Sequence, residues 1–329
     1  MSREHELHDP DVLGLAAAAR LAKRPWPAQP ITNDIEVSFE FFPPNDGAGA
    51  QSLAACVDQL SVFDPSFVSV TYGAGGTTQS RTLATIATLS QVTSLNVSGH
   101  LTSVSKTAEE VDEVVDAYAS AGLRHIVALR GDVPDGAENN GIVDGGYSSA
   151  AELVAGIRSR DDGATFDISV AGYPEVHPRA ASAEADIEHL KRKVDMGADR
   201  VLTQFFFDTD AFMSFFERCR AAGIDVPIVP GIMPVTNFAN IARFSKRCGT
   251  TIPDWMPELL SELDDDPTVQ RMVAATVAAE QCRTLSEFGI RQFHFYTMNR
   301  PELTAATCRI LGVRPAQPVD ASNSASASA

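Results

Sequence analysis

The stretch Val37-Ser38-Phe39-Glu40-Phe41-Phe42, followed at once by Pro43-Pro44, is the part of the sequence from which the fold is read. Its β-branched and aromatic residues favour an extended strand. The two prolines end that strand, because proline has no backbone N–H to donate to a ladder. We therefore interpret this run as the first strand of the fold, with one carboxyl group, that of Glu40, inside it.

Seven similar runs follow along the chain, and amphipathic stretches separate them. The predicted strands lie at residues 36–42, 67–73, 96–102, 125–131, 166–173, 200–207, 227–233 and 293–299. The predicted helices lie at residues 50–63, 79–90, 107–122, 149–160, 182–197, 208–223, 237–246 and 267–289. Ser182 is a predicted helix cap, and Gly122, Gly197 and Gly223 stand where helices should end.

Eight strands alternating with helices predict a single-domain (β/α)8 barrel, the TIM barrel, because an open doubly wound sheet more often has about five or six strands. We place the barrel at residues 32–314. Residues 1–31 are rich in proline and predict a partly irregular N-terminal arm, and the low-complexity segment 315–329 predicts a disordered tail. A further short helix is expected between residues 252 and 267.

The composition limits the possible functions. The 329 residues carry a net charge of -17, which disfavours binding to nucleic acid or to an anionic membrane. The five cysteines form no Cys-x-x-Cys pair, so neither a disulfide framework nor a zinc site is predicted. No run of about 18 apolar residues occurs, and the N-terminus lacks the apolar segment of a signal peptide. We expect a cytoplasmic protein without a metal.

Glu40 is the first candidate for chemistry. A carboxyl group among phenylalanines loses hydration when it is buried, so we expect its pKa to rise toward that of a working general acid. The alternative is structural: Glu40 pairs with a buried arginine or lies on an exposed face of the strand.

In a TIM barrel the reactive face is built from the C-terminal ends of the strands. Polar residues stand at those predicted ends, and each has a structural alternative. His100 could be a core histidine, Gln204 a strand cap, Tyr173 a packing residue, and Arg130 with Asp132 a salt bridge. The glycine-rich loop at residues 73–78 is a weak anion-binding signal.

One predicted helix face is more specific. Asp186, His189, Arg192 and Lys193 have the spacing of one face of a helix. A solvated charged face is the ordinary interpretation. Near the rim of a barrel, the same face would bind a pyrophosphate and a ribose.

Several segments together resemble bacterial 5,10-methylenetetrahydrofolate reductase over most of the chain, from about Val37 to Gly312. They are the segments at residues 38–44, 68–74, 124–132, 173–178, 204–208 and 294–297. The resemblance implies a TIM barrel with non-covalently bound FAD. It implies that NADH or NADPH reduces the flavin, which then reduces methylenetetrahydrofolate to 5-methyltetrahydrofolate for methionine synthesis. It also implies a homo-oligomer.

The resemblance also implies roles for single residues. Glu40 matches the general acid that protonates N10 of the folate. Asp132 matches an aspartate close to both flavin and pterin. The positions that match substrate-binding residues are Gln204, Asn240, Phe244 and Arg300, in addition to Asp132. The positions that match flavin-binding residues are Thr71, Tyr72, Ala74, His100, Arg130, Gly131, Asp132, Tyr173, His177, Ala180, Asp186, His189, Arg192 and Lys193.

The sequence departs from the family pattern at three places. The segment after Asp132 is longer than usual, which leaves open whether Tyr147, Ser149 or Ala150 meets the flavin. His189 and Asn240 stand where Asn and Gln are expected. These departures affect local contacts rather than the chemistry.

Two other classes of function remain to be weighed. A metal-dependent or Schiff-base barrel lyase is disfavoured, because no lysine lies at a predicted strand end on the rim and the histidines do not cluster with carboxylates at ligand spacing. A flavin- or folate-binding protein without turnover is disfavoured by the presence of both Glu40 and Gln204.

Overall fold

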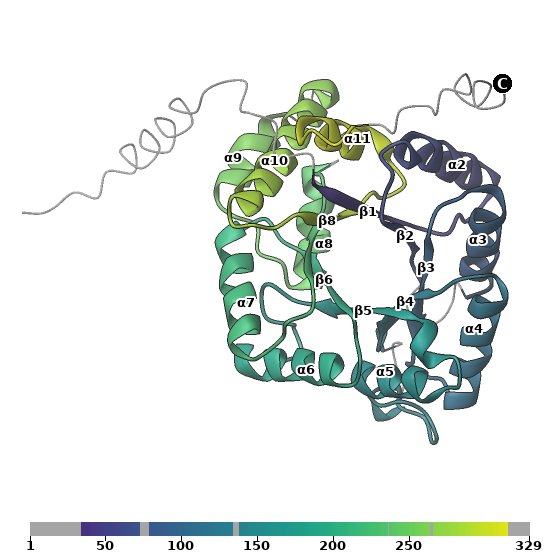
Figure 1. Cartoon of the computed structure of the whole chain (residues 1–329). Helices are drawn as coiled ribbons and strands as arrows, with labels where there is room; N and C mark the ends of the chain where they lie inside the picture. Colours follow the sequence, from purple (N-terminus) through teal and green to yellow (C-terminus); the bar gives the residue numbers. More distant parts are fainter. Residues whose placement is uncertain (1–33, 73–78, 134–137, 236, 264–265, 315–329) are drawn as a thin grey trace, which may run out of the picture.

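Eight parallel strands close into a barrel in chain order, with the helices outside (Figure 1). The computed structural model describes residues 34–314 except 73–78, 134–137, 236 and 264–265. The strands are β1 (Glu36–Phe41), β2 (Phe67–Val70), β3 (Val97–Thr102), β4 (His125–Leu129), β5 (Asp167–Gly172), β6 (Arg200–Phe205), β7 (Ile228–Ile232) and β8 (Gln292–Tyr296). β8 pairs with β1, which completes the ring and confirms the predicted TIM barrel.

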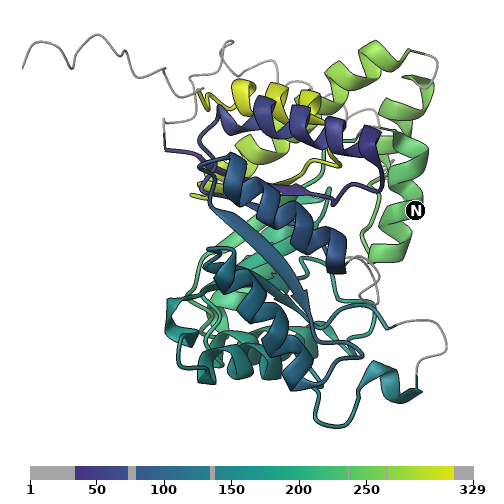
Figure 2. The same ribbon diagram turned by 90° about the vertical axis from the view of Figure 1, so that its right-hand side faces the viewer.

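The helices lie on the outside of the barrel, and a second view shows how they cover it (Figure 2). They are α2 (Gly47–Ser61), α3 (Gln79–Val92), α4 (Ala108–Ser120), α5 (Ala150–Ser159), α6 (Ala183–Asp195), α7 (Thr209–Ala221), α8 (Phe238–Cys248), α9 (Trp255–Leu260), α10 (Pro267–Glu287) and α11 (Pro301–Ile310). Short 3-10 turns lie at Glu138–Gly141, Gly163–Thr165 and Ser261–Leu263.

The ends of the helices follow local sequence signals. Ser182 accepts a hydrogen bond from the backbone of Ala185, which confirms it as the cap of α6. Thr107 and Glu110 form a reciprocal capping box at the start of α4. The expected short helix after β7 is α9. The sequence analysis did not predict α11, although Pro301 at its first position is a common helix-start signal.

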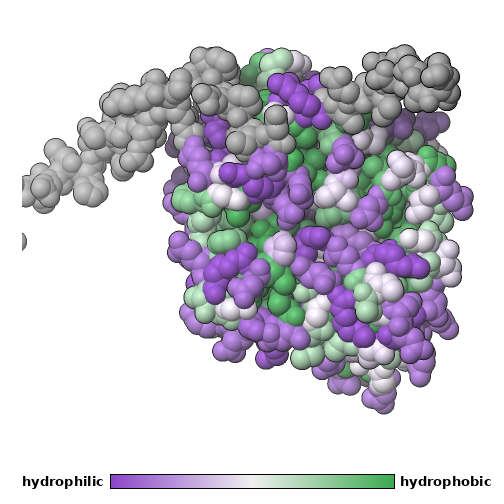
Figure 3. All heavy atoms as spheres, in the orientation of Figure 1, coloured by the Kyte–Doolittle hydropathy of each residue, from purple (hydrophilic) through white to green (hydrophobic). Residues whose placement is uncertain are grey.

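Apolar side chains fill two separate regions. Alternate residues of the strands point outward and form the main core with the helices, as Phe39 and Phe41 do. A smaller apolar cluster inside the barrel contains Phe67, Val127 and Leu202. On the face seen in Figure 3, polar residues cover much of the surface, and apolar residues show between them.

Some of the predicted features lie outside the described residues. These are the N-terminal arm at residues 1–31, the tail at 315–329, and the glycine-rich loop at 73–78 together with Ala74. Among the helices that the structure does describe, none is both long enough and apolar enough to cross a membrane.

Candidate active site at the barrel mouth

Glu40 lies inside the barrel at the C-terminal end of β1, with histidines from two other strands beside it. Its Oε2 atom is 3.2 Å from Nε2 of His100 on β3 and 3.6 Å from Nε2 of His294 on β8. Nδ1 of His294 lies 2.8 Å from the hydroxyl of Ser38, one inward position below Glu40 on β1. The residue is 7% exposed. The side chains next to the carboxyl group are therefore imidazoles and not phenylalanine rings.

The expectation of a raised pKa is wrong for the ligand-free protein. Burial raises the pKa of Glu40, but the charges and hydrogen bonds of His100 and His294 together lower it by more than burial raises it. The net pKa is about 2. The phenylalanines do not decide the balance, because Phe39 and Phe41 point into the outer core and Phe42 is 37% exposed. Among the described residues no buried arginine pairs with Glu40, and the residue is not on an exposed face, so neither structural alternative holds there.

Backbone contacts fix the end of β8 against the end of β1. The hydroxyl of Thr297 donates to the carbonyl oxygen of Glu40 at 2.7 Å. The amide side chain of Asn299 both accepts from the N–H of Phe42 and donates to its carbonyl oxygen, each at 2.9 Å. These bonds hold Glu40 and the exposed Arg300, which follows Asn299, at the same side of the mouth.

At the end of β4 the rim turns sharply. Gly131 has a φ of +89°, and a Cβ atom there would lie 2.7 Å from the side chain of Val104, so glycine is required. Arg130 donates to the carbonyl oxygen of Asn140. Asp132 is exposed and lies 4.0 Å from Arg179. The considered Arg130–Asp132 salt bridge is therefore not present.

The loop after β5 and the start of α6 bring several predicted flavin-binding residues together. The rings of Tyr173 and His177 contact edge to face, with centroids 4.5 Å apart. Asp186 accepts a hydrogen bond from the backbone N–H of His177 at 3.0 Å. Lys193 donates to the carbonyl oxygen of Ala171 on β5, and burial lowers its pKa to about 8.

The remaining members of this group lie around that cluster. The backbone N–H of Ala180 donates to the carbonyl oxygen of His177 at 2.8 Å. His189 and Arg192 are exposed on α6. Lys193 thus lies against the barrel, while Arg192 faces solvent.

Three of the predicted substrate-binding residues lie on β6 and α8. Gln204 accepts a hydrogen bond from the backbone N–H of Phe205 at 3.1 Å. Phe244 stacks on Phe205 with ring centroids 5.5 Å apart and planes 10° apart. Asn240 is exposed on α8. A shallow depression beside them is lined by Gln204 and Tyr173 among others.

The three residues considered after the long insertion all have structural roles. A Cβ atom at Gly156 on α5 would lie 2.1 Å from the hydroxyl of Tyr147, so the tyrosine packs closely on that helix. Ser149 caps α5 by accepting from the N–H of Glu152, and Ala150 is the buried first residue of the helix.

The rim residues fit a large anionic cofactor such as FAD. The hydroxyl groups of Tyr72, Thr102 and Ser103 are buried at the ends of β2 and β3 and have no hydrogen-bond partner among the described residues. Buried polar atoms are rarely left unpaired, so they suit a polar ligand. Thr71 is partly buried next to Tyr72 and donates its backbone N–H to Phe41. Across the mouth, Arg192 and Lys193 are suited to phosphate groups.

The sequence analysis missed two residues of the site. His294 contacts Glu40 directly, and the hydroxyl of Tyr296 donates to the carbonyl oxygen of Thr203 at 2.7 Å. Both lie on β8 with the inward-facing Gln292, at every second position. Every second residue of a strand faces the same side, so the predicted strand already implied that His294 and Tyr296 share one face.

A closed barrel with a buried acid at its C-terminal mouth is the architecture of a TIM-barrel enzyme, because active sites of this fold lie at that face. A family model described as Methylenetetrahydrofolate reductase matches residues 28–312. The chain is 46% identical over 283 residues to the 5,10-methylenetetrahydrofolate reductase of Pectobacterium carotovorum, covering 85% of this chain and 91% of that one. The chain therefore belongs to the methylenetetrahydrofolate reductase family.

Two more distant proteins are also similar. The Arabidopsis thaliana protein called methylenetetrahydrofolate reductase (NADH) 1 is 38% identical over 271 residues, which are 80% of this chain and 46% of that one. The solved structure of an uncharacterized Clostridium thermocellum protein that binds two copies of 5-methyl-5,6,7,8-tetrahydrofolic acid has a TM-score of 0.57. It is 13% identical and covers 87% of this chain and 97% of that one, so it supports the fold alone.

Proposed function

We propose that this methylenetetrahydrofolate reductase binds FAD non-covalently and works in two half-reactions with Glu40 as the general acid. NADH or NADPH is the electron donor, and the name of the Arabidopsis relative supports NADH. The bound flavin would accept a hydride from the nicotinamide and pass it to the methylene carbon of the folate. The chain's own residues then have to bind both ligands, exclude water and supply one proton.

The observation that carries the proposal is the group formed by Glu40, His100 and His294. Protonation of the folate at N10 opens its five-membered ring and leaves an iminium carbon, which accepts the hydride. In the ligand-free protein the Glu40 carboxylate is ionised beside two imidazoles, as its pKa of about 2 indicates. When ligands cover the mouth and remove water, the ionised carboxylate loses hydration, which favours the neutral acid. The proton then lies on Glu40, ready for transfer.

Cofactor binding is assigned to the rim between β2 and α6. Thr71, Tyr72 and His100 would contact the flavin ring from β2 and β3, while Arg130, Gly131 and Asp132 would contact it at the end of β4. The residues that would hold the rest of the cofactor are Tyr173, His177, Ala180, Asp186, His189, Arg192 and Lys193. A negative charge at Asp132 would tune the reactivity of the flavin and orient the folate.

Substrate binding is assigned to the opposite side of the mouth. Gln204, Asn240 and Arg300 would hydrogen-bond the folate or the nicotinamide, and Asp132 would contact the pterin. Phe244 would leave or extend its stack on Phe205 to pack against an aromatic ring of the ligand. One site would thus receive the two substrates in turn, as a ping-pong reaction requires.

Absorption spectroscopy of the purified protein tests the proposed function. The protein should be yellow, should bleach with NADH or NADPH under anaerobic conditions, and should regain its colour when methylenetetrahydrofolate is added. A colourless protein that binds no FAD would contradict the cofactor assignment. A yellow protein that bleaches but never recovers with folate would contradict the folate half-reaction.

A further inference from the structure

A row of inward-facing residues crosses four strand pairs from Glu40 to the opposite end of the barrel. The strand register pairs Glu40 with Ser69, Ser69 with Ser98, Ser98 with His125, and His125 with Asp167. Because barrel strands are tilted, such a row descends along the axis as it passes from strand to strand. Glu40 lies near the C-terminal end of β1, whereas Asp167 is the first residue of β5.

The polar side chains in the middle of this row are buried and lack hydrogen-bond partners among the described residues. The hydroxyl groups of Ser69 and Ser98 and the Nδ1 atom of His125 are buried and have no hydrogen-bond partner among the residues that the structure describes. Their neighbours in sequence belong to the outer core, for example Val68 and Val97, so the three polar groups face the barrel interior. Three consecutive members of one row therefore lack partners at the same place.

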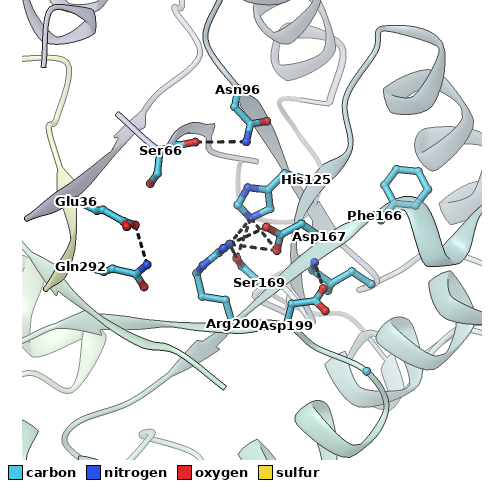
Figure 4. A network of polar contacts seen from close by, with 12 residues as sticks. Glu36, Ser66, Asn96, His125, Phe166, Asp167, Ser169, Asp199, Arg200 and Gln292 are labelled. Carbon is cyan, nitrogen blue, oxygen red and sulfur yellow. Dashed lines mark hydrogen bonds and ion pairs between the residues drawn. The ribbon is translucent and has the colours of Figure 1, made fainter. Parts of the chain in front are cut away.

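The lower end of the row lies in a network of polar contacts that His125 shares with Asp167, Ser169 and Arg200 (Figure 4). His125 Nε2 lies 2.8 Å from the hydroxyl of Ser169 and 4.0 Å from the carboxylate of Asp167. Asp167 pairs with Arg200 at 3.1 Å, and its side chain is 40% exposed. A proton from bulk water can thus reach His125 through Asp167.

Water molecules suit the gaps between the row's polar groups. Neighbouring strands lie about 4.8 Å apart, and one water spans up to about 5.6 Å with two hydrogen bonds of about 2.8 Å. A buried water typically satisfies polar groups that have no other partner. Inside the barrel, Phe67, Val127, Leu202 and Val229 form an apolar cluster next to the row, and the Phe67 ring packs on the ring of His125.

We propose that the row Ser69, Ser98 and His125 is a proton path that recharges Glu40 from the N-terminal face of the barrel. This inference rests on the proposed function, in which each turnover transfers one proton from Glu40 to folate N10. The Glu40 carboxylate then accepts a proton from the row, each hydroxyl or water passes one on to its neighbour, and bulk water supplies the last at Asp167. One proton enters the barrel for each that leaves on the product, and no electron moves.

The chemistry of His125 agrees with this role. Burial, together with the positive charge of Arg200, lowers its pKa to about 3, so the ring is neutral near pH 7. A neutral imidazole has one nitrogen that accepts and one that donates, and it passes on a proton by exchanging them. The path matters when ligands cover the mouth, because water then no longer reaches Glu40 from above.

The test replaces Ser98 with alanine and measures both half-reactions of the FAD-loaded enzyme by anaerobic stopped-flow. Reduction by NADH should keep its rate, because that step needs no proton from Glu40. Folate reduction over repeated turnovers should slow by about tenfold or more, up to the roughly 10²- to 10⁴-fold contribution of a positioned acid. Thr304→Val is the matched control, because it removes a buried, unpartnered hydroxyl on α11 outside the barrel.

A second measurement does not depend on turnover. A high-resolution crystal structure of the wild-type protein should show ordered waters that join Ser69, Ser98 and His125, and Ser98→Ala should interrupt that chain. A dry gap in the wild type, or wild-type folate reduction by Ser98→Ala, would overturn the proton path while leaving the proposed function intact. Failure of the wild type itself to reduce methylenetetrahydrofolate would instead overturn the proposed function on which the path rests.

Discussion

At Glu40, burial and two neighbouring histidines shift the pKa of the carboxyl group in opposite directions. Burial disfavours the charged carboxylate, whereas His100 and His294 stabilise it, and the histidines prevail in the ligand-free protein. The same carboxyl group is therefore an ion in the open site, and under the proposed function it becomes an acid when its surroundings lose water. A fixed raised pKa is not needed for general-acid catalysis at this position.

Removing both histidines should reverse the direction of the shift. In the variant His100→Gln with His294→Gln, burial alone acts on Glu40, so its pKa should rise above the ordinary value of about 4.3. In the wild type the carboxylate should stay ionised until the pH approaches 2. Carbon-13 NMR of labelled glutamate, assigned with Glu40→Gln, measures both values. A pKa that stays low in the double variant would contradict the assignment of the two histidines as its cause.

Single residues of the site were predictable only in part. Glu40, Asp132 and Gln204 were predicted as candidates because they interrupt apolar strands or follow them directly. The environment of Glu40 was not found, because sequence neighbours in a strand point to opposite faces. Phe39 and Phe41 therefore lie away from the carboxyl group, and its true neighbours come from β3 and β8.

At the scale of elements, the N-terminal ends of β4, β5 and β6 share one polar network around His125. The ring faces Asp167 and Ser169 of β5 and Arg200 of β6, and Phe67 of β2 packs on it with centroids 4.4 Å apart. The nearby positive charges and burial keep the imidazole neutral. Charging it in acid therefore opposes the folded state.

This network should make stability depend on pH. The pKa of His125 is about 3 in the folded protein and about 6.5 when unfolded, so the unfolded state binds the proton more readily. Its contribution is complete above about pH 6.5 and is lost as the pH falls toward 3, with a slope of up to about 1.4 kcal/mol per pH unit. His125→Gln should show a shallower fall of the free energy of unfolding in urea titrations. The exposed His189→Gln is the control, and parallel curves for His125→Gln and wild type would contradict the prediction.

The elements themselves were largely predictable. All eight strands were placed, because each is a short β-branched or aromatic run between turn signals. Helix α11 was missed, since the prediction ended at the last strand. The row from Glu40 to Asp167 could not be predicted from the sequence, because strand register depends on how the barrel closes and not on local sequence.

At the scale of the whole molecule, the barrel collects at one mouth residues that are far apart in the chain. Glu40 comes from β1 and His294 from β8, 254 positions further along the sequence. The net charge of -17 gives no general attraction for an anionic ligand. Under the proposed function, local cations of the rim such as Lys193 would hold the anionic parts of the flavin or folate.

The most direct test of the account is anaerobic stopped-flow on Glu40→Gln, with the two half-reactions followed separately. Glutamine fills nearly the same space but cannot donate the acid proton. The account predicts that NADH still reduces the bound flavin at close to the wild-type rate, while reduction of methylenetetrahydrofolate falls by about 10²-fold or more. An equal loss in both half-reactions, or a folate half-reaction that keeps its wild-type rate, would contradict the assignment of Glu40 as the general acid.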